Sequence, residues 1–233
     1  MDRTTTPSGK RVLLIGATGM IGGHALHLCL DHDEVTTVTV IGRRSTGVSD
    51  PGLVEIEHDD LGDYRAVSDG LVHQDVALFC LGAYTGTLPD DEFRRITVDY
   101  TVAFVEALHA GSPDAVVCFL SGQGADQTEK SRMSFARYKG AAEKALLAAG
   151  FSRVHIFRPG YIYPITPRRE PNLTYRIFRA IYPAVRYIYP NVGLRSDDLA
   201  RAMVHAGLHG TDEHEDPVLE NRAIRELARR VAQ

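Results

Sequence analysis

Residues 12–22 read Val-Leu-Leu-Ile-Gly-Ala-Thr-Gly-Met-Ile-Gly, an apolar run followed by glycines at 16, 19 and 22. The run Val12–Ile15 predicts a buried strand, and the apolar positions of Ile21–Leu30 predict a helix with a wide buried face. Glycines at such a junction permit a tight turn, a close approach of backbone N–H groups to a pyrophosphate, and close helix–strand packing. The spacing is G-x-x-G-x-x-G rather than G-x-G-x-x-G. Its strand–helix context, with a helix N-terminus that attracts phosphate, nevertheless predicts a dinucleotide-binding loop.

Outward from this loop, short β-rich runs alternate with helical patterns. Further strands are predicted at Val35–Ile41, Val54–Ile56, Val76–Cys80, Val116–Leu120, Val154–Phe157 and, as a short edge strand, Val218–Leu219. Helices are predicted at Glu92–Ala110, Phe135–Ala149, Ser196–Ala206 and Asn221–Val231. Strands that are apolar throughout and separated by helices indicate a parallel sheet covered on both faces. The predicted fold class is therefore α/β, a Rossmann-like doubly wound parallel sheet whose ligands bind at the carboxyl ends of the strands.

Two of the predicted helices carry more detailed expectations. The inward face of the helix over 92–110 is expected to carry four residues, Val98, Val102, Val105 and Leu108. Ser196 is expected to cap the helix that it begins, with Asp197 and Asp198 in the first turn. Acidic side chains are favourable there because they complement the helix dipole.

Length and composition indicate a single globular domain over 1–233. Hydrophobic residues make up 44% of the chain and charged residues 24%, which is typical of a packed protein. The formal net charge of −4 argues against nucleic-acid binding, since that function usually needs a basic surface. No apolar run approaches the ~18 residues that a membrane-spanning helix needs. Nothing in the sequence decides between a monomer and a homodimer.

The cysteines and the N-terminus bear on the cellular compartment. Cys29, Cys80 and Cys118 lie in apolar stretches without metal-type spacing, which predicts buried free thiols in a reducing compartment. Met1–Arg11 is polar and lacks the apolar core of a signal peptide. We therefore expect a cytoplasmic protein.

The end of the second predicted strand indicates which dinucleotide is bound. NAD-preferring sites place an acidic residue on the ribose 2′-hydroxyl, about 20 residues after the glycine loop. Here that position falls at Gly42-Arg43-Arg44, where there is no carboxylate. Two guanidinium groups suit a 2′-phosphate, which they can bind through charge-assisted, often bidentate hydrogen bonds. The sequence thus favours NADP(H); the alternative is that one or both arginines are ordinary solvated charges.

The segment 161–195 departs from the regular alternation, with five prolines and six arginines, and we interpret it as an insertion that caps the cofactor site. Within it, Leu173–Tyr189 has apolar residues at helical spacing, interrupted by Pro183. Three interpretations stay open. The helix could pack its aromatic stripe on the core, form a lid over an aromatic or acidic small-molecule substrate, or lie on a membrane surface.

Motifs along nearly the whole chain, apart from this segment, match one superfamily. They are Gly16–Gly22, Ile41–Arg44, Cys80–Gly82, Leu120-Ser121 with Gly124–Asp126, Lys139-Gly140, Phe157–Gly160, and Leu219–Asn221 with Ala223-Ile224. Through them the chain resembles the extended and atypical branch of the short-chain dehydrogenase/reductase superfamily. Within that branch it is most similar to the Tat-interacting oxidoreductase family, whose members bind NADP(H).

The resemblance implies a cofactor site built from successive strand ends. The residues that would hold the pyrophosphate are Gly16, Thr18, Gly19, Met20, Ile21 and Gly22. Asp60 and Leu61 would border the adenine, and Cys80, Leu81, Gly82 and Ala83 would run past the adenosine ribose. Ser121 would lie beside the nicotinamide half, Lys139 would hydrogen-bond the nicotinamide ribose, and Pro159 and Gly160 would line the carboxamide.

The catalytic pair of these reductases is incomplete in this chain. They use Tyr-x-x-x-Lys, in which the two side chains share a helix face and the phenol transfers a proton. The residue four positions before Lys139 is Phe135, which has no proton to give, and Tyr138 would point roughly 100° away around the helix. The position of the catalytic hydroxyl in active extended members falls nearer Gln123 than Ser121.

Several functions are compatible with this incomplete pair. The leading one is an NADP(H)-dependent oxidoreductase acting on a small carbonyl or alcohol substrate, with Lys139 and Ser121 ordering the nicotinamide half. The proton would come from Tyr84, Tyr161 or Tyr163, or the reaction would need only hydride transfer. The alternatives are a non-catalytic NADP(H)-binding regulator and an epimerase or isomerase that uses the cofactor transiently.

No metal site is predicted. None of the ten histidines shows metal-ligand spacing with a second histidine, cysteine or carboxylate. The run His58-Asp59-Asp60 is more simply interpreted as the turn beside the adenine.

Overall fold

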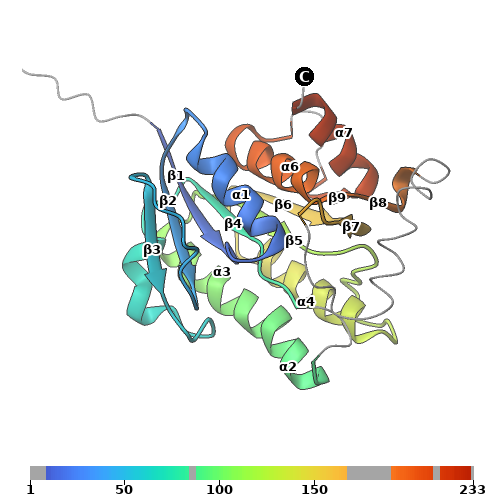
Figure 1. Cartoon of the computed structure of the whole chain (residues 1–233). Helices are drawn as coiled ribbons and strands as arrows, with labels where there is room; N and C mark the ends of the chain where they lie inside the picture. Colours follow the sequence, from blue (N-terminus) through green and yellow to red (C-terminus); the bar gives the residue numbers. More distant parts are fainter. Residues whose placement is uncertain (1–8, 84–87, 167–189, 212–215, 232–233) are drawn as a thin grey trace, which may run out of the picture.

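A parallel seven-stranded sheet forms the centre of the molecule (Figure 1). The computed structural model describes residues 9–83, 88–166, 190–211 and 216–231. The sheet order is β3-β2-β1-β4-β5-β6-β9. The strands are β1 (Lys10–Ile15), β2 (Val35–Gly42), β3 (Leu53–Glu57), β4 (Val76–Phe79), β5 (Val116–Leu120), β6 (Arg153–Arg158) and β9 (Val218–Glu220). The predicted fold class and all seven predicted strands are confirmed.

Helices cover both faces of this sheet (Figure 1). They are α1 (Met20–Leu30), α2 (Asp90–Arg94), α3 (Tyr100–Gly111), α4 (Ser134–Ala148), α6 (Ser196–His209) and α7 (Asn221–Val231). Shorter helical turns lie at Arg65–Leu71 and Pro190–Val192. One core cluster joins the sheet to α1, α6 and α7, and the other joins it to α3 and α4.

Strand β1 shows why helices must pack on both faces of the sheet. Val12 and Leu14 lie in the core cluster of the α1 face, whereas Leu13 and Ile15 lie in the cluster of the α3 face. Alternate side chains of a strand point to opposite faces, so a strand that is apolar throughout is stable only between two layers of helices.

The order of connections fixes where a ligand can bind. From β1 the chain runs through α1 to β2 and β3 on one side, and then crosses back to β4 on the other side of β1. At such a reversal the connections after β1 and β4 leave in opposite directions, which opens a crevice at their carboxyl ends. The glycine loop lies directly in that crevice because it begins where β1 ends at Ile15.

The helix predicted over 92–110 is present but has an irregular centre. It consists of α2, a π-helical turn at Arg95–Asp99, and α3. The buried positions of α3 are Thr101, Phe104, Val105 and Leu108. Val102, expected on the inward face, is only half-buried. At about 100° per residue, Val102 lies at the edge of the face that Thr101, Phe104, Val105 and Leu108 share, which corrects its predicted inward position.

The start of α6 also corrects one expectation. Ser196 is the first helical residue, and Arg195, in extended conformation, is the N-cap. The Ser196 hydroxyl instead lies 3.2 Å from Nε2 of His24 and accepts a 3.3 Å hydrogen bond from the Ile165 N–H. A buried hydroxyl between two other segments is satisfied by them rather than by its own helix. Asp197 and Asp198 lie in the first turn, as expected.

The segment 161–195, interpreted from the sequence as a cap, is described only at its two ends. There β7 (Tyr161–Tyr163) pairs in parallel with β8 (Gly193–Arg195) in a second, two-stranded sheet. The predicted helix Leu173–Tyr189 lies outside the described residues, as does Tyr84. All three cysteines are buried and free, as expected. Among the described residues, none of the helices combines the length and apolarity that a membrane crossing requires.

Candidate functional site

The loop between β1 and α1 is shaped by three close backbone approaches. Gly16 has a φ of 87°, and a Cβ there would lie 2.8 Å from backbone atoms of Cys80 and Leu81. A Cβ on Gly22 would lie 2.2 Å from the Gly16 carbonyl oxygen. The Gly19 N–H closes the turn on that same carbonyl at 2.9 Å. The glycines therefore let α1 begin directly against the sheet, with its first N–H groups directed into the crevice.

A pocket opens beside this loop. Its lining residues are Gly16, Ala17, Thr18, Val40, Ile41, Gly42, Arg43, Arg44, Leu61 and Leu81. Both arginines are exposed, and Nη2 of Arg44 lies 3.4 Å from the Thr18 hydroxyl. The pocket thus brings the glycine loop, the arginine pair and the residues expected beside adenine and ribose to one place.

Other residues of the expected adenosine half lie around or behind this pocket. Cys80 is buried, while Gly82 is exposed and Ala83 half-buried at the end of the described segment. The Asp60 carboxylate accepts a 3.0 Å hydrogen bond from the Gly62 N–H, so it stabilises the turn that carries Leu61. Leu61 itself is nearly inaccessible at 2% exposure and forms part of the pocket floor.

The expected nicotinamide half lies at the carboxyl ends of β5 and β6. The Gln123 N–H donates to the Pro159 carbonyl at 2.9 Å, and the Ser121 N–H donates to Phe157 at 2.8 Å. The Gly160 N–H donates to Asn221 Oδ1 at 2.9 Å. These bonds join the loops after β5 and β6 to the start of α7, and they fix the backbone on which Pro159 and Gly160 lie.

Lys139 is buried beneath this edge, with 7% of its surface exposed. Its ammonium group donates to the Leu120 carbonyl at 2.9 Å and lies 5.2 Å from the centroid of the Phe119 ring. Burial lowers the pKa of Lys139 to about 8, although the negative charge of Glu143 opposes the shift. Lys139 therefore lies where the β5 strand ends, with a pKa of about 8.

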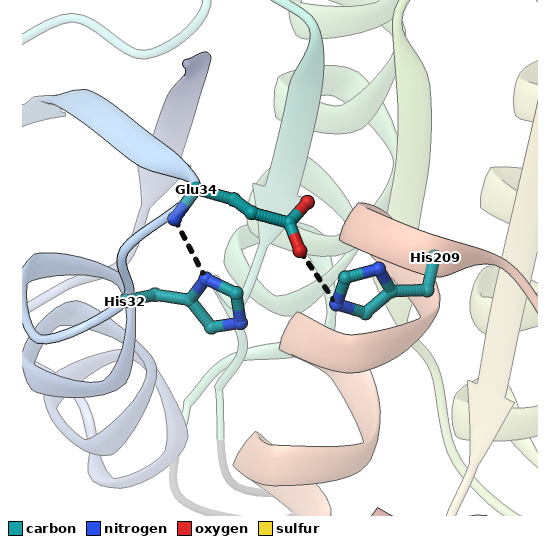
Figure 2. A group of neighbouring side chains, drawn as sticks. All are labelled: His32, Glu34 and His209. Atoms are coloured by element: carbon teal, nitrogen blue, oxygen red, sulfur yellow. Dashed lines mark hydrogen bonds and ion pairs between the residues drawn. The ribbon is translucent and has the colours of Figure 1, made fainter.

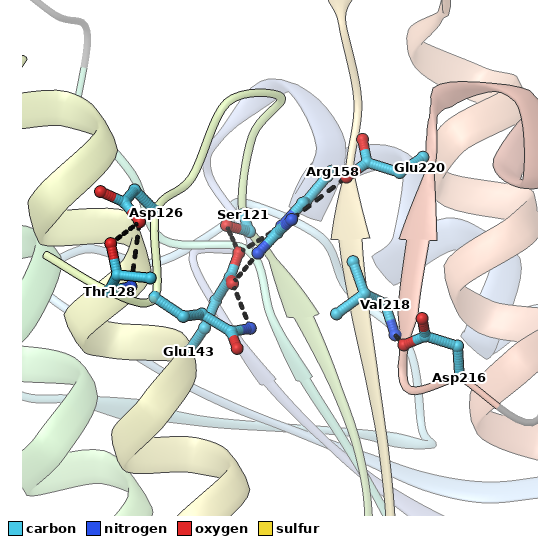
Figure 3. Close-up of polar contacts among 9 residues, drawn as sticks. Ser121, Asp126, Thr128, Glu143, Arg158, Asp216, Val218 and Glu220 are labelled. Carbon is cyan, nitrogen blue, oxygen red and sulfur yellow. Dashed lines mark hydrogen bonds and ion pairs between the residues drawn. The ribbon is translucent and has the colours of Figure 1, made fainter. Parts of the chain in front are cut away.

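A buried carboxylate connects the strand ends. Glu143, on α4, is 0% exposed and accepts hydrogen bonds from three side chains (Figure 3). The donors are the Ser121 hydroxyl at 2.5 Å, Gln127 Nε2 at 2.8 Å, and Arg158 Nε and Nη2 at 2.9 and 2.5 Å. Arg158 also reaches Glu220, on β9, at 3.1 Å. These contacts raise the pKa of Arg158 above its usual range.

This network uses the only hydroxyl proton of Ser121. Because that proton is donated to Glu143, the side chain of Ser121 braces the interior of the site instead of facing the pocket edge. The backbone of Ser121, by contrast, lies at the carboxyl end of β5. That placement fits a contact through the main chain better than a catalytic hydroxyl.

The two aromatic residues near Lys139 face different ways. The half-buried Phe135 ring packs on Gly122, where a Cβ would lie only 2.7 Å from Cζ of the ring. The Tyr138 hydroxyl donates to the Asp90 carboxylate of α2 at 2.6 Å, and this bond raises the pKa of Tyr138. The prediction that Tyr138 points away from the Lys139 face is confirmed.

The substitute tyrosines can be assessed only in part. Tyr161 and Tyr163 lie on β7 directly after Gly160, and both are half-buried. The hydroxyl oxygen of Tyr161 is hidden from solvent. Both residues are thus carried next to the expected nicotinamide half, beside the loop that holds Gln123.

Sequence reasoning missed the residues that depend on distant segments. Glu143 had one available signal, its position four residues after Lys139 on the same buried helix face, since a buried charge requires partners. Asn221 was part of a motif matched in the sequence, but its contact with Gly160 was not predicted, and Gln127 gave no comparable signal. The spacing of the histidines in the sequence indicated no grouping, but His32, Glu34 and His209 come together at the opposite end of the sheet (Figure 2). Folding brings His209 to two residues that lie more than 170 positions earlier in the chain, and the spacing of residues in the sequence cannot reveal such a contact.

The chain matches one protein-family model and resembles named proteins over most of its length. The sequence model of the NAD dependent epimerase/dehydratase family matches residues 12–181. Protein HTATIP2 of Rattus norvegicus is 27% identical over 229 residues, which cover 94% of this chain and 90% of that protein. The mitochondrial protein fmp52 of Aspergillus clavatus is 30% identical over 213 residues, which cover 84% of this chain and 86% of that protein.

Solved structures share the fold at lower identity. The Bordetella bronchiseptica enzyme WbmG, in complex with NAD, superposes with a TM-score of 0.66 at 15% identity, covering 99% of this chain and 79% of that one. An oxidoreductase of the short-chain dehydrogenase/reductase family from Burkholderia thailandensis gives 0.64 at 17% identity, covering 91% and 90%.

The Glu143 network yields a stability prediction. Glu143→Gln removes the charge that three donors share and turns an amide N–H₂ toward Arg158, whose guanidinium, with 15% side-chain exposure, then keeps the exposed Glu220 in place of the buried carboxylate. We expect the free energy of unfolding, measured by urea denaturation, to fall by about 3–5 kcal/mol. The matched control is Glu129→Gln, which breaks an exposed pair with Lys144 and should cost less than about 1 kcal/mol. Equal losses in the two variants would contradict a bracing role for Glu143.

Proposed function

The chain belongs to the NAD dependent epimerase/dehydratase family, and from this we propose that it is an NADP(H)-dependent oxidoreductase of the atypical short-chain type. Its substrate would be a small carbonyl or alcohol, and Phe135 replaces the usual catalytic tyrosine. The observation that carries the proposal is the pocket at the β1–β4 reversal, where the glycine loop faces Arg43 and Arg44. A single domain over 1–233, with 161–195 capping the site, would hold both ligands.

The residues on the dinucleotide side fit such a cofactor. The cradle at Gly16 and Gly22 admits no Cβ, so it leaves room for a pyrophosphate against the first N–H groups of α1. Arg43 and Arg44 would grip the 2′-phosphate, with Arg44 held beside the loop by its contact with Thr18. A ~100-fold preference for NADP(H) over NAD(H) needs only about 2.7 kcal/mol, which one good phosphate contact can supply.

On the nicotinamide side, the residues of this chain would mainly bind and orient the cofactor, and few of them would take part in the reaction itself. The bound cofactor supplies or accepts a hydride. Pro159 and Gly160 would hold the carboxamide, and Lys139 would hydrogen-bond the ribose. With a pKa lowered to about 8 by burial, Lys139 is mainly protonated at pH 7 and can hold a proton close to the reacting centre. A phenol of Tyr161, Tyr163 or Tyr84 is the alternative acid.

A second candidate function is a non-catalytic NADP(H)-binding regulator. Two observations favour it: Phe135 carries no proton at the position of the acid, and Ser121 donates its proton to Glu143. General acid catalysis typically contributes 10²–10⁴-fold to the rate, so a site without it would bind far better than it reacts. The family name also keeps open an epimerase that uses the cofactor transiently.

The compartment and the assembly state belong to the same proposal. Three buried free thiols suit a reducing compartment, for which the cytoplasm is our expectation. The fungal relatives carry the label mitochondrial in their names, so a mitochondrial location is the alternative. We also propose that the protein forms a homodimer. The substrate beneath the cap would be aromatic or acidic.

The arginine assignment predicts a selective loss of affinity. In the double variant Arg43→Ala/Arg44→Ala, NADPH binding should weaken by ~100-fold, or about 2.7 kcal/mol, because both 2′-phosphate contacts are removed. NADH binding should change little, since it carries no 2′-phosphate. Calorimetric titration checks both. Arg65→Ala, at an exposed arginine outside the pocket, is the control. Equal weakening of NADPH and NADH would refute the assignment.

The missing phenol predicts a gain of function. Phe135→Tyr places a hydroxyl on the face of α4 that carries Lys139, beside Gly122, and should raise carbonyl reduction about 10²-fold or more if this acid is the only defect. The readout is NADPH oxidation in the presence of a panel of carbonyl compounds. Tyr138→Phe, which alters a phenol bound to Asp90 on another face, should leave the rate unchanged. No gain in Phe135→Tyr would favour the regulator.

A further inference from the structure

His32, Glu34 and His209 form a cluster at the end of the sheet opposite the dinucleotide pocket (Figure 2). His32 and Glu34 lie in the turn between α1 and β2, and His209 is the last residue of α6. One potential ligand atom from each residue lies within 4.8 Å of the other two. His209 Nε2 and Glu34 Oε1 are 3.8 Å apart.

The spacing is close to that of a bound metal ion. Tetrahedral zinc with ligands at ~2.0–2.2 Å has its ligand atoms about 3.3–3.6 Å apart. The three groups would therefore need to converge by at most about 1.5 Å. Their side chains are partly accessible, 35% for His209 and 52% for Glu34, so an ion can enter and the side chains can adjust.

The surrounding charges favour a cation. The turn reads Asp31-His32-Asp33-Glu34, which places three carboxylates within four residues, and both aspartates are exposed. Two helices end here: α1 at Leu30 and α6 at His209. A helix C-terminus carries a partial negative charge, so both ends add to the attraction.

One hydrogen bond opposes the binding of an ion and adds to its cost. His32 Nδ1 accepts a 3.2 Å hydrogen bond from the Glu34 N–H, which leaves the ring proton on Nε2. Nε2 lies on the side that faces Glu34 and His209 (Figure 2). Binding through Nε2 must therefore move this proton and give up that bond. Lys10 is a nearby cation, but its ammonium group is directed at the Leu208 carbonyl.

We propose that His32, Glu34 and His209 bind a divalent transition-metal ion of the zinc class, which clamps the end of α1 to the end of α6. Two imidazoles and one carboxylate are ligands that Zn²⁺ accepts, and water would complete the tetrahedron. The two helices pack against each other on one face of the sheet, so the ion ties segments that are already neighbours. The site is independent of the dinucleotide pocket, since it lies at the amino end of β2.

The test is a titration of the full chain, freed of any histidine tag, with ZnCl₂ in a calorimeter and in a thermal unfolding assay. One Zn²⁺ should bind per chain. At a free concentration ~100-fold above the Kd, the Tm should rise by about 5–10 °C. Loss of a supporting residue around a metal typically costs 10–100-fold in affinity, so His32→Gln and His209→Gln should each weaken binding by at least about tenfold.

The control is His27→Gln, at an exposed histidine of α1 outside the cluster, which should bind zinc as the unaltered chain does. All variants should bind NADPH with unchanged affinity, which shows that they remain folded. Absence of zinc binding by the unaltered chain would overturn the proposal. So would an equal loss of affinity in His27→Gln, because that result means nonspecific binding by surface histidines.

Discussion

The contact between the Gly16 carbonyl and the backbone of Gly22 is the constraint from which the rest of the site follows. A Cβ on Gly22 would lie 2.2 Å from that oxygen, so β1 and α1 can approach each other only through glycine. This approach aims the N-terminus of α1 at the β1–β4 reversal, where the parallel sheet already opens a crevice. The arginine pair at the end of β2 then lies across the same pocket.

A second constraint acts at the other half of the site. Glu143 is fully buried and is tolerated there because Ser121, Gln127 and Arg158 share its charge. The network fixes the ends of β5 and β6, and through Glu220 it reaches β9. It also gives Ser121 a supporting role and leaves Lys139 as the titratable group at the end of β5. The ends of β5 and β6 are therefore held in one arrangement, and in our proposal the proton transfer beside them differs from that of a Tyr-x-x-x-Lys pair.

The sequence allowed the sheet and the glycine-rich turn between β1 and α1 to be predicted, because both depend on local patterns. Apolar strands such as Val116–Leu120 and the glycine spacing at 16–22 carry their information within a few residues. The inward position of Val102 was mispredicted because the apolar spacing did not show that the buried face of α3 is centred on Thr101, Phe104 and Leu108. The Glu143 network and the cluster around His209 were missed for a different reason, since each joins segments far apart in the chain and exists only after folding.

The account is tested most directly by calorimetric titration of the unaltered chain with NADPH and NADH, side by side at one ionic strength. The glycine cradle and the two arginines predict binding of NADPH at one site per chain, about 100-fold tighter than NADH, which corresponds to about 2.7 kcal/mol. Equal affinities would contradict the 2′-phosphate assignment. Binding of neither dinucleotide would contradict the whole account, because the cradle at Gly16 and Gly22 would then serve another ligand.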